Sequence, residues 1–400
     1  MKLGDIVTLV RGNTYKSSLL SETEGPVLLG LGSIREGGGF KRGTWKHYPE
    51  EPDSRIILHP GDLYVSLKDL TQSCNLLGAV SRTPADLKEG RLTQDTVKLE
   101  FNPSANELDK QYVYWSLRTP QYRAYCKARG TGTTNMSLSR SDFLDWEIPA
   151  KSKTRNGLIS LFECIETKIE LNNQINDYLD EYSTTLFENW LSRCTNVVTI
   201  GEIAEEILDY SKLNGPFAKL INSSDVTEGV FPSPKPIENK DLKGHFKKRF
   251  RKYDILYSEI RPRNHHYGYV MFEADDWIST TRLMVIRNKP SMISSGLLYY
   301  YLKSNCVTDE FTLKTETRSG TFPQGKYVDM ASIKVPYSPV EMQGEIANKI
   351  ASVLKAIHVN QTENEKLNEL RNILLPKLMS GDIDVSKVDI TQLNNHLSDC

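Results

Sequence analysis

Apolar positions in residues 156–193 recur every three or four residues, a spacing that places them on one face of a helix. The pattern continues over several heptads, so it predicts a long helix with a coiled-coil seam. Polar residues interrupt this seam at Asn172, Asn176 and Ser183. Buried asparagines can fix the register of a helix pair, and solvated breaks in the seam are equally compatible with the sequence.

A second long helix is predicted over residues 340–379, and its seam repeats the first one 188 residues later. At ~1.5 Å rise per residue, each helix of ~38 residues would span about 57 Å. Gly381 stands where a C-terminal cap is expected, and Pro376 is expected to bend or end the helix. The matched seam positions include Leu158 with Ile346, Asn172 with Asn360, Asn176 with Asn364, and Trp190 with Leu378.

Each helix follows a stretch of mixed character. Residues 26–31, 55–58, 63–65 and 96–101 are β-branched and aromatic runs broken by Gly, Pro and Asn, which predicts strands and loops, while residues 112–125 predict one helix. Residues 195–338 repeat this stretch. IREG at 34–37 recurs as VTEG at 226–229, and Asp62 of GDLYVS recurs as Asp254 of YDILYS, both 192 residues later. Two copies of a domain-plus-helix unit are therefore expected.

We predict an α/β protein in which two tandem mixed domains are joined by two long helices, paired as an antiparallel coiled coil with a pseudo-two-fold internal repeat. The expected segments are a first domain at 1–150, a central helix at 151–194, a second domain at 195–338, a C-terminal helix at 339–381 and a polar tail at 382–400.

Composition narrows the chemistry. The six cysteines are scattered without a CxxC pair, so we expect a reducing cytoplasm and neither a disulfide framework nor a zinc site. No apolar stretch approaches the ~20 residues of a membrane helix. Net charge is −1, so any surface for nucleic acid must come from local charge clusters.

One such cluster lies just before YDILYS, where aromatic residues alternate with basic ones. Phosphates attract clusters of this kind regardless of base sequence, although a solvated basic face has the same composition. The candidate phosphate contacts are Lys247, Lys248, Arg249 and Arg251.

The loops after the two repeated strands are candidates for contacts with bases. In the second copy, Arg261 and Arg263 can fork onto guanine, Asn264 can pair with adenine, and His265 can donate to a base edge or a phosphate. Surface salt bridges are the alternative role for such arginines. The first copy offers amides and hydroxyls instead, with further cations upstream of it. Its candidates are Lys68, Thr71, Gln72 and Asn75, with Arg35, Lys41 and Arg42 as backbone contacts.

Two glycine-rich loops correspond in the two copies, and a basic residue flanks each one. Each could face DNA or could simply be a turn that closes its domain. The candidates in these loops are Thr133, Thr134, Asn135, Arg318, Thr321 and Gln324.

Signatures of catalysis are missing from the sequence. It contains no [N/D]PP[Y/F] word of an amino-methyltransferase, no HExxH and no GxSxG, and its Pro-Asp and Glu-x-Lys words do not follow the order of a common nuclease site. The sequence therefore favours a binding module without catalytic activity.

The chain resembles the specificity (S) subunits of type I restriction–modification systems. The similar words are GDLYVS with LLGAV, YDILYS with YGYV, GTGTTNMSLS before FLDWEIP, SGTFPQG before MASIKVP, TTLFENWL, and LRNILLPKLMSGDI. Their order, twice over, covers the chain to about residue 383. The second copy departs from the pattern in having YDIL in place of the usual GDIL.

The resemblance implies sequence-specific binding of double-stranded DNA, with one half of an asymmetric, bipartite site recognised by each domain. It further implies that the helices set the spacing and dock two methyltransferase (M) subunits, with restriction (R) subunits in some complexes. The chain itself would carry no cofactor, while the complex would use S-adenosylmethionine, and ATP and Mg²⁺ where a restriction subunit is present. We expect docking at apolar seam ends, namely Leu186, Trp190, Leu374 and Leu378. A two-headed coiled-coil scaffold that binds proteins is the alternative function.

Overall fold

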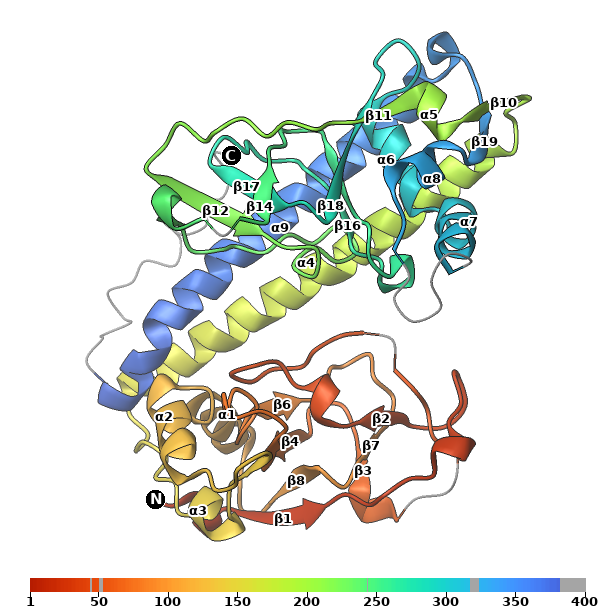
Figure 1. Ribbon diagram of the computed structural model, residues 1–400. Coiled ribbons are helices and arrows are strands. Elements are labelled where there is room, and N and C mark those ends of the chain that lie inside the picture. The colour runs from red at the N-terminus through yellow and green to blue at the C-terminus, as the bar shows by residue number, and fades with distance from the viewer. Residues whose placement is uncertain (44, 50–52, 243, 317–323, 382–400) are drawn as a thin grey trace. The chain divides into compact units, whose positions relative to one another are not determined.

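The computed structural model describes residues 1–43, 45–49, 53–242, 244–316 and 324–381, and the chain divides into two compact units (Figure 1). Unit 1 comprises residues 1–167 and residues from 367 onward, and unit 2 comprises residues 168–366. Each unit contains a mixed domain and part of both long helices, α4 (Lys153–Leu191) and α9 (Gly344–Ser380).

The strands of unit 1 are β1 (Val7–Arg11), β2 (Val27–Leu29), β3 (Ile57–Leu58), β4 (Leu63–Ser66), β5 (Lys68–Asp69), β6 (Val80–Arg82), β7 (Gly90–Leu92), β8 (Thr96–Phe101) and β9 (Met136–Ser137). Its shorter helices are η1 (Leu3–Asp5), η2 (Ser17–Leu19), η3 (Leu31–Ser33), η4 (Ser54–Ile56), α1 (Glu107–Ser116), α2 (Pro120–Arg129) and α3 (Arg140–Leu144).

The strands of unit 2 are β10 (Asn196–Thr199), β11 (Ala204–Glu206), β12 (Phe217–Ile221), β13 (Ile237–Glu238), β14 (Phe246–Lys248), β15 (Ile255–Ser258), β16 (Tyr267–Tyr269), β17 (Trp277–Thr280), β18 (Leu283–Asn288) and β19 (Lys334–Tyr337). Its shorter helices are α5 (Ile200–Ile203), η5 (Asn239–Asp241), η6 (Pro262–Asn264), α6 (Ser295–Lys303), α7 (Asn305–Glu316), α8 (Tyr327–Ala331) and η7 (Val340–Met342).

The first sheets of the two mixed domains have the same strand order, and their second sheets share a three-strand pattern, which confirms the predicted internal repeat. Unit 1 contains a four-stranded antiparallel sheet in the order β1-β8-β4-β6, and unit 2 contains its counterpart, β11-β18-β15-β16. A second sheet in each unit pairs β2 with β7, or β12 with β17, in parallel. In each of these sheets a further strand, β3 or β14, runs antiparallel to β7 or β17.

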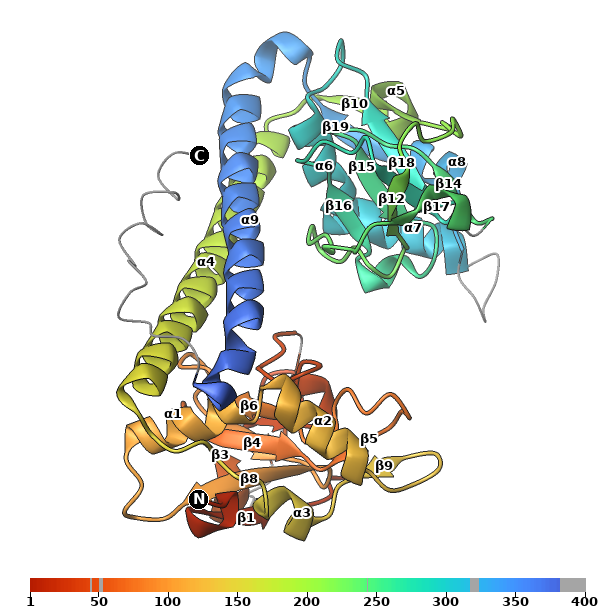
Figure 2. The same ribbon diagram turned by 90° about the vertical axis from the view of Figure 1, so that its left-hand side faces the viewer.

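Each domain packs its first sheet and two short helices onto the helix pair of its own unit. In unit 1, Val65 of β4 and Trp115 of α1 share a buried core with Phe162 of α4 and Leu378 of α9. In unit 2, Ile255 of β15 and Tyr301 of α6 share a core with Phe187 of α4 and Ile350 of α9. Figure 2 labels the elements β15, α6, α4 and α9 that contribute these residues. The apolar seam therefore contacts domain residues as well as the partner helix.

A buried ionic network also fixes the domain of unit 1 to its helices. Arg118 Nη1 lies 3.1 Å from Glu166 Oε2 on α4, and Arg371 Nη1 on α9 lies 3.3 Å from the same atom. Burial alone would raise the pKa of Glu166, but these two guanidinium groups lower it to about 2. In unit 2, different residues connect the domain to the helices: Lys303 and Tyr300 of α6 contact the Asp180 carboxylate of α4.

Residues 112–125 were expected to form one helix, and this expectation is wrong. The structure has α1 and α2 with a break between them, because Thr119 caps α2 through its side chain and Pro120 occupies the first turn. Proline has no amide hydrogen to continue the preceding helix, and its fixed φ suits a helix start.

The end of α9 differs in part from the expectation. The helix continues through Pro376 to Ser380, so the proline does not end it. Gly381 has φ +74° and donates its amide to Lys377, which confirms the predicted cap. Arg155 of α4 donates to the carbonyls of Leu378 and Met379, each at 2.9 Å, and so pairs the last turn of α9 with the start of α4.

The matched asparagines pair with one another within unit 2, and all but the half-buried Asn360 are buried. Asn172 Nδ2 donates to Asn364 Oδ1 at 2.9 Å, and Asn360 Nδ2 donates to Asn176 Oδ1 at 2.8 Å. Asn172 is 1% exposed, so its amide would be unsatisfied in any other register of the two helices. Of the two roles left open by the sequence, the structure supports register fixing.

Candidate nucleic-acid interface

Loop 1 (residues 67–76) follows β4, and loop 2 (residues 259–266) follows β15, its counterpart in the repeat. The two loops start in the same way. Ser66 Oγ accepts the Lys68 amide at 3.1 Å, and Ser258 Oγ accepts the Ile260 amide at 3.0 Å. Each loop then pairs with the segment after α2 or α7, through Lys68 with Ser137 in unit 1 and Ile260 with Gln324 in unit 2.

A buried carboxylate organises loop 1. Asp69 is 2% exposed, and it accepts the Thr71 amide at 2.8 Å and the Leu76 amide at 2.7 Å. Burial alone would raise the pKa of Asp69, but the hydrogen bonds from Leu76 and Thr71 outweigh it and lower the pKa below its ordinary value. The loop therefore has a fixed shape that exposes Thr71, Gln72 and Asn75.

Two of the predicted loops of unit 1 lie together. Gln72 Nε2 donates to the carbonyl of Thr133 at 2.6 Å, so the hydroxyl and amide residues Thr133, Thr134 and Asn135 stand exposed beside loop 1. Lys68 lies 2.8 Å from Asp95 and is half-buried. Thr71, Gln72, Asn75 and the three residues of the glycine-rich loop are thus exposed polar groups of this surface.

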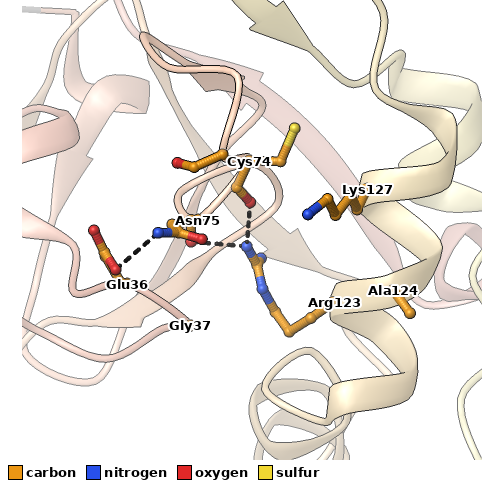
Figure 3. Close-up of a pocket in the computed structure, with 8 residues that line it drawn as sticks. Glu36, Gly37, Cys74, Asn75, Arg123, Ala124 and Lys127 are labelled. Carbon is orange, nitrogen blue, oxygen red and sulfur yellow. Dashed lines mark hydrogen bonds between the residues drawn. The ribbon is translucent and has the colours of Figure 1, made fainter. Parts of the chain in front are cut away.

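Loop 1 also forms one wall of an open cavity of about 260 Å³ (Figure 3). Arg123 of α2 donates to the carbonyls of Cys74 and Asn75, at 2.9 and 2.8 Å, and so joins the loop to the helix. On the opposite wall, Glu36 Oε2 accepts the Asn75 amide at 2.9 Å. Lys127 of α2 also lines the cavity.

Loop 2 has the same attachment and different chemistry. It contains η6 (Pro262–Asn264), flanked by Arg261 and His265, whose φ angles of +47° and +53° are in the left-handed region. His265 Nδ1 lies 3.1 Å from Glu228 Oε1, and Arg263 Nε lies 3.3 Å from Glu316. Arg261, Arg263 and Asn264 are exposed, and Gln324 donates to Glu259 at 3.1 Å.

The basic stretch of unit 2 is only partly available at the surface. Lys248 is 3% exposed, and its Nζ lies 3.0 Å from Glu206 and 3.0 Å from the Leu283 carbonyl. Arg249 is half-buried and donates to the carbonyl of Asp275. Lys248 was predicted as a phosphate contact, and its buried ion pair contradicts that role. Lys247 and Arg251 remain exposed.

This basic stretch does not adjoin loop 2. It precedes β15, whereas loop 2 follows it, so a strand of four residues, roughly 13 Å long, separates them. In unit 1, Arg35 and Lys41 are exposed, and Arg42 forms a bidentate pair with Asp86 at 2.8 and 3.0 Å. Arg318 and Thr321 lie outside the described residues.

Of the four expected docking residues, only Leu378 is contradicted, because it is buried. The other three are partly buried, and their role in docking stays a prediction. Leu378 is 0% exposed in the core of unit 1, and Leu374 packs against the same core. Leu186 and Trp190 pack against the core of unit 2. Leu378 is covered because the domain of unit 1 folds onto the helix seam, which the repeat alone did not reveal.

An exposed apolar stripe lies elsewhere on α4. Its members are spaced at four, three and four residues, so they share one helix face. They are Leu171, Ile175, Tyr178 and Tyr182, exposed by 49, 47, 71 and 52%. This stripe was missed because it lies beside the seam, although its spacing was visible in the sequence.

Other sites missed from the sequence are acidic. Asp69 shapes loop 1, and Glu36 and Glu228 contact the two loops; acidic residues do not indicate contact with phosphates, so their charge did not mark them as site residues. The repeat of IREG as VTEG was the available signal, since it places both glutamates at equivalent positions.

The described residues contain no group of three or more His, Cys, Asp or Glu side chains that could hold a metal ion. Within the same part of the chain, no helix is long and apolar enough to cross a membrane.

Comparisons with known proteins agree with the sequence resemblance. A family model, the type I restriction modification DNA specificity domain, matches residues 195–369. The Type I restriction enzyme HindI specificity subunit of Haemophilus influenzae is 31% identical over 201 residues, which cover 50% of this chain and 44% of that protein. The match thus spans less than half of the relative's length.

The fold matches that of a solved protein over nearly its whole length. The S subunit of a type I restriction–modification system from M. genitalium aligns with a TM-score of 0.55 and 15% identity, covering 94% of this chain and 95% of that chain. This likeness concerns the fold alone. The family model and the curated relative agree with this likeness: residues 195–369 match the type I restriction modification DNA specificity domain, and the chain is similar to specificity subunits of type I restriction–modification systems.

Proposed function

We propose that this chain is the non-catalytic DNA-recognition subunit of a type I restriction–modification complex in the cytoplasm. Each mixed domain recognises one half of an asymmetric, interrupted site. The paired helices set the distance between the half-sites and dock two methyltransferase subunits, and restriction subunits join some complexes.

The observation that carries this proposal is that loops 1 and 2 are attached to equivalent elements of the repeat but expose different kinds of side chain. Loops 1 and 2 start at equivalent serines and pair with equivalent segments. Loop 1 exposes Thr71, Gln72 and Asn75, whereas loop 2 exposes Arg261, Arg263 and Asn264. Side chains of these types donate to and accept from base edges in the major groove, and different sets select different bases. Such a pair of loops suits two unlike half-sites.

A domain exchange tests the proposal. Residues 196–338 would be replaced by the same region of a related subunit, and methylated sites would be mapped in cells that also express the methyltransferase. We expect one half-site to change while the other half-site and the spacer stay the same. A change in both half-sites, or in neither, would contradict recognition by separate domains.

The exposed stripe on α4 is our candidate for a methyltransferase-docking surface. An exposed run of four large apolar side chains is unusual for a surface that stays in water, and buried interfaces favour tyrosine. Replacing Ile175 and Tyr178 by Arg should reduce the number of methyltransferase subunits that co-purify with the chain. Glu188→Arg, an exposed change on another face of α4, is the control. Equal stoichiometry in both variants would exclude the stripe.

Spacer length can be tested with insertions at opposed places in the helix pair. Because Asn176 pairs with Asn360, four residues added after Asn176 and four added before Asn360 lengthen both helices together. The added turn of about 6 Å should lengthen the spacer by one or two base pairs, at ~3.4 Å each. A variant that methylates sites with the original spacer would show that the helices do not set the distance.

A further inference from the structure

The acidic turns before each loop, at residues 34–37 and 226–229, are an anomaly on a surface proposed to contact DNA. Glu36 and Glu228 occupy equivalent positions in the repeat, each followed by a glycine with positive φ, +76° for Gly37 and +82° for Gly229. Both glutamates are exposed. Phosphates repel exposed carboxylates, so two of them at matched places need a different role.

Each carboxylate is held against the loop of its own unit. Glu36 Oε2 accepts the Asn75 side-chain amide at 2.9 Å, and the Gly37 amide donates to the Asn75 carbonyl at 3.2 Å. In unit 2, Glu228 Oε1 lies 3.1 Å from His265 Nδ1, and the Glu228 amide donates to the His265 carbonyl at 2.9 Å. Backbone and side-chain bonds therefore fix the position of each glutamate relative to the loop.

The bond to the loop leaves each carboxylate with unused capacity. An ionised carboxylate has two oxygens and about four lone-pair directions, and the loop side chain takes up one of them. In unit 1 the remaining capacity borders the open cavity, which Glu36 lines with Asn75 and Lys127 (Figure 3). A hydrogen-bond donor that enters from solvent can therefore reach Glu36.

The chemistry of base edges selects one donor. A carboxylate only accepts hydrogen bonds, and in the major groove the amino groups of cytosine and adenine are the donors. The amino group of adenine stands beside the acceptor N7, which repels a carboxylate, whereas cytosine N4 has no acceptor next to it on its own base. Cytosine is therefore the preferred partner.

Resting on the function proposed above, we propose that Glu36 and Glu228 are specificity-determining residues, each of which accepts a hydrogen bond from the N4 amino group of a cytosine in the half-site of its own domain. The proposal places one C·G base pair in each half-site, next to the base pairs contacted by loop 1 and loop 2.

The test is a binding selection from a library of duplexes with randomised half-sites. It uses the complex of the full chain with its methyltransferase subunits. Unsubstituted protein should select a cytosine at one position of each half-site. Glu36→Gln should relax that position in the half-site of unit 1 alone, by roughly 5- to 100-fold in discrimination, and should admit adenine, which glutamine can pair with. Glu228→Gln should do the same in the other half-site.

Two further variants separate base recognition from loop positioning. Asn75→Ala removes the loop partner of Glu36 and leaves its carboxylate, so it should change selection only at the base pairs that loop 1 contacts, while the cytosine preference at the Glu36 position should remain. Glu24→Gln, an exposed change in unit 1 outside loop 1, is the control and should select the original site.

Unchanged selection by both glutamine variants would overturn the inference and leave the proposed function intact. The same conclusion would follow if Asn75→Ala lost the cytosine preference while the glutamine variants kept it. Absence of any selected site with the unsubstituted protein would instead contradict the proposed function. Thermal unfolding of each variant shows whether it is folded, so a damaged fold is not mistaken for lost recognition.

Discussion

Loops 1 and 2 occupy equivalent places in the repeat but are held in their conformations by residues of opposite charge. In unit 1, the buried Asp69 carboxylate accepts hydrogen bonds from the amides of Thr71 and Leu76. The residue 192 positions later is Arg261, which is exposed and has a left-handed backbone conformation. Loop 2 is held instead by the turn at Pro262–Asn264 and by contacts to Glu228 and Glu316.

The two units share some features of these loops and differ in others. Strand order, the serine turn and the glutamate contact are the same in both units. The loop side chains and the device that fixes the loop are different. A loop that depends on its own internal bonds can change without disturbing the sheet, so under the proposed function each unit could acquire a new specificity alone.

The largest expected difference concerns the repeated aspartates. Asp254 is fully buried and forms a bidentate pair with Arg287, at 2.7 and 2.8 Å. Asp62 contacts Lys98 at 2.7 Å and is 30% exposed. Asp254→Ala should cost about 3–5 kcal/mol, because it breaks a bidentate pair whose carboxylate is buried and leaves the partly buried Arg287 without it, while Asp62→Ala should cost about 1 kcal/mol. Denaturant unfolding measures the loss in the free energy of unfolding for each variant, and equal losses would show that the two aspartates contribute equally to stability.

A smaller effect is expected at the bases. Arg261→Ala or Arg263→Ala should reduce discrimination at one or two base pairs in the half-site of unit 2, by about 1–3 kcal/mol for each guanine fork. As a control, Lys247→Ala with Arg251→Ala should weaken binding to all sequences and lower the log–log salt slope by about 0.9 for each lost phosphate contact. Selections and salt titrations would be compared, and an unchanged base preference in the loop variants would exclude them as base contacts.

The start of β4 and β15 offers a contrast in backbone strain. Gly61 has φ +86°, and its counterpart Tyr253 has φ +72°, a conformation that costs a non-glycine residue about 1–2 kcal/mol. Gly61→Ala should destabilise the protein by about that amount. An added Cβ has no atom within 4 Å, so the cost comes only from the positive φ that alanine would have to adopt. Tyr253→Gly should change stability less, because relief of strain is offset by loss of the stacked contact with Tyr269. Equal and opposite shifts in Tm would contradict this.

The smallest effect is local and depends on pH. The pKa of Asp69 is lower in the folded protein than in the unfolded chain, so its contribution is complete above about pH 4 and is lost as pH falls through the folded pKa. Hydrogen exchange at the Thr71 and Leu76 amides should quicken in acid beyond the change seen in loop 2. Asp69→Asn should remove that pH dependence, and parallel behaviour of the two loops in the parent protein would rule out Asp69 as its cause.

Periodicity made most of the fold predictable. The seam at residues 156–193 and its copy predicted the two long helices, and the repeat predicted that both domains share one topology. The break between α1 and α2 was missed although Thr119 and Pro120 mark a helix start. The aromatic residues on both sides of the break share a helical spacing, so the pattern resembles that of one continuous helix and conceals the cap at Thr119.

The site was less predictable, because sequence shows which residues a segment contains and not where they point. Lys248 belongs to a basic run, yet it faces the interior, where Glu206 offsets its charge. Leu378 continues an apolar seam, yet the domain of unit 1 covers it. Both facts depend on packing between segments far apart along the chain. The loops themselves were found because the repeat marks their position.

The asparagine pairs have a consequence for how such a chain could arise. Asn172 meets Asn364, which is the repeat counterpart of Asn176, and Asn176 meets Asn360, the counterpart of Asn172. One ancestral half, containing a single domain and a single helix, would therefore present complementary asparagines to a second identical half. Two such halves could dimerise in this same register before their genes fused. If each domain recognises one half-site, as proposed, such a dimer would recognise a palindrome, and fusion of the two genes would allow each half to diverge toward its own sequence.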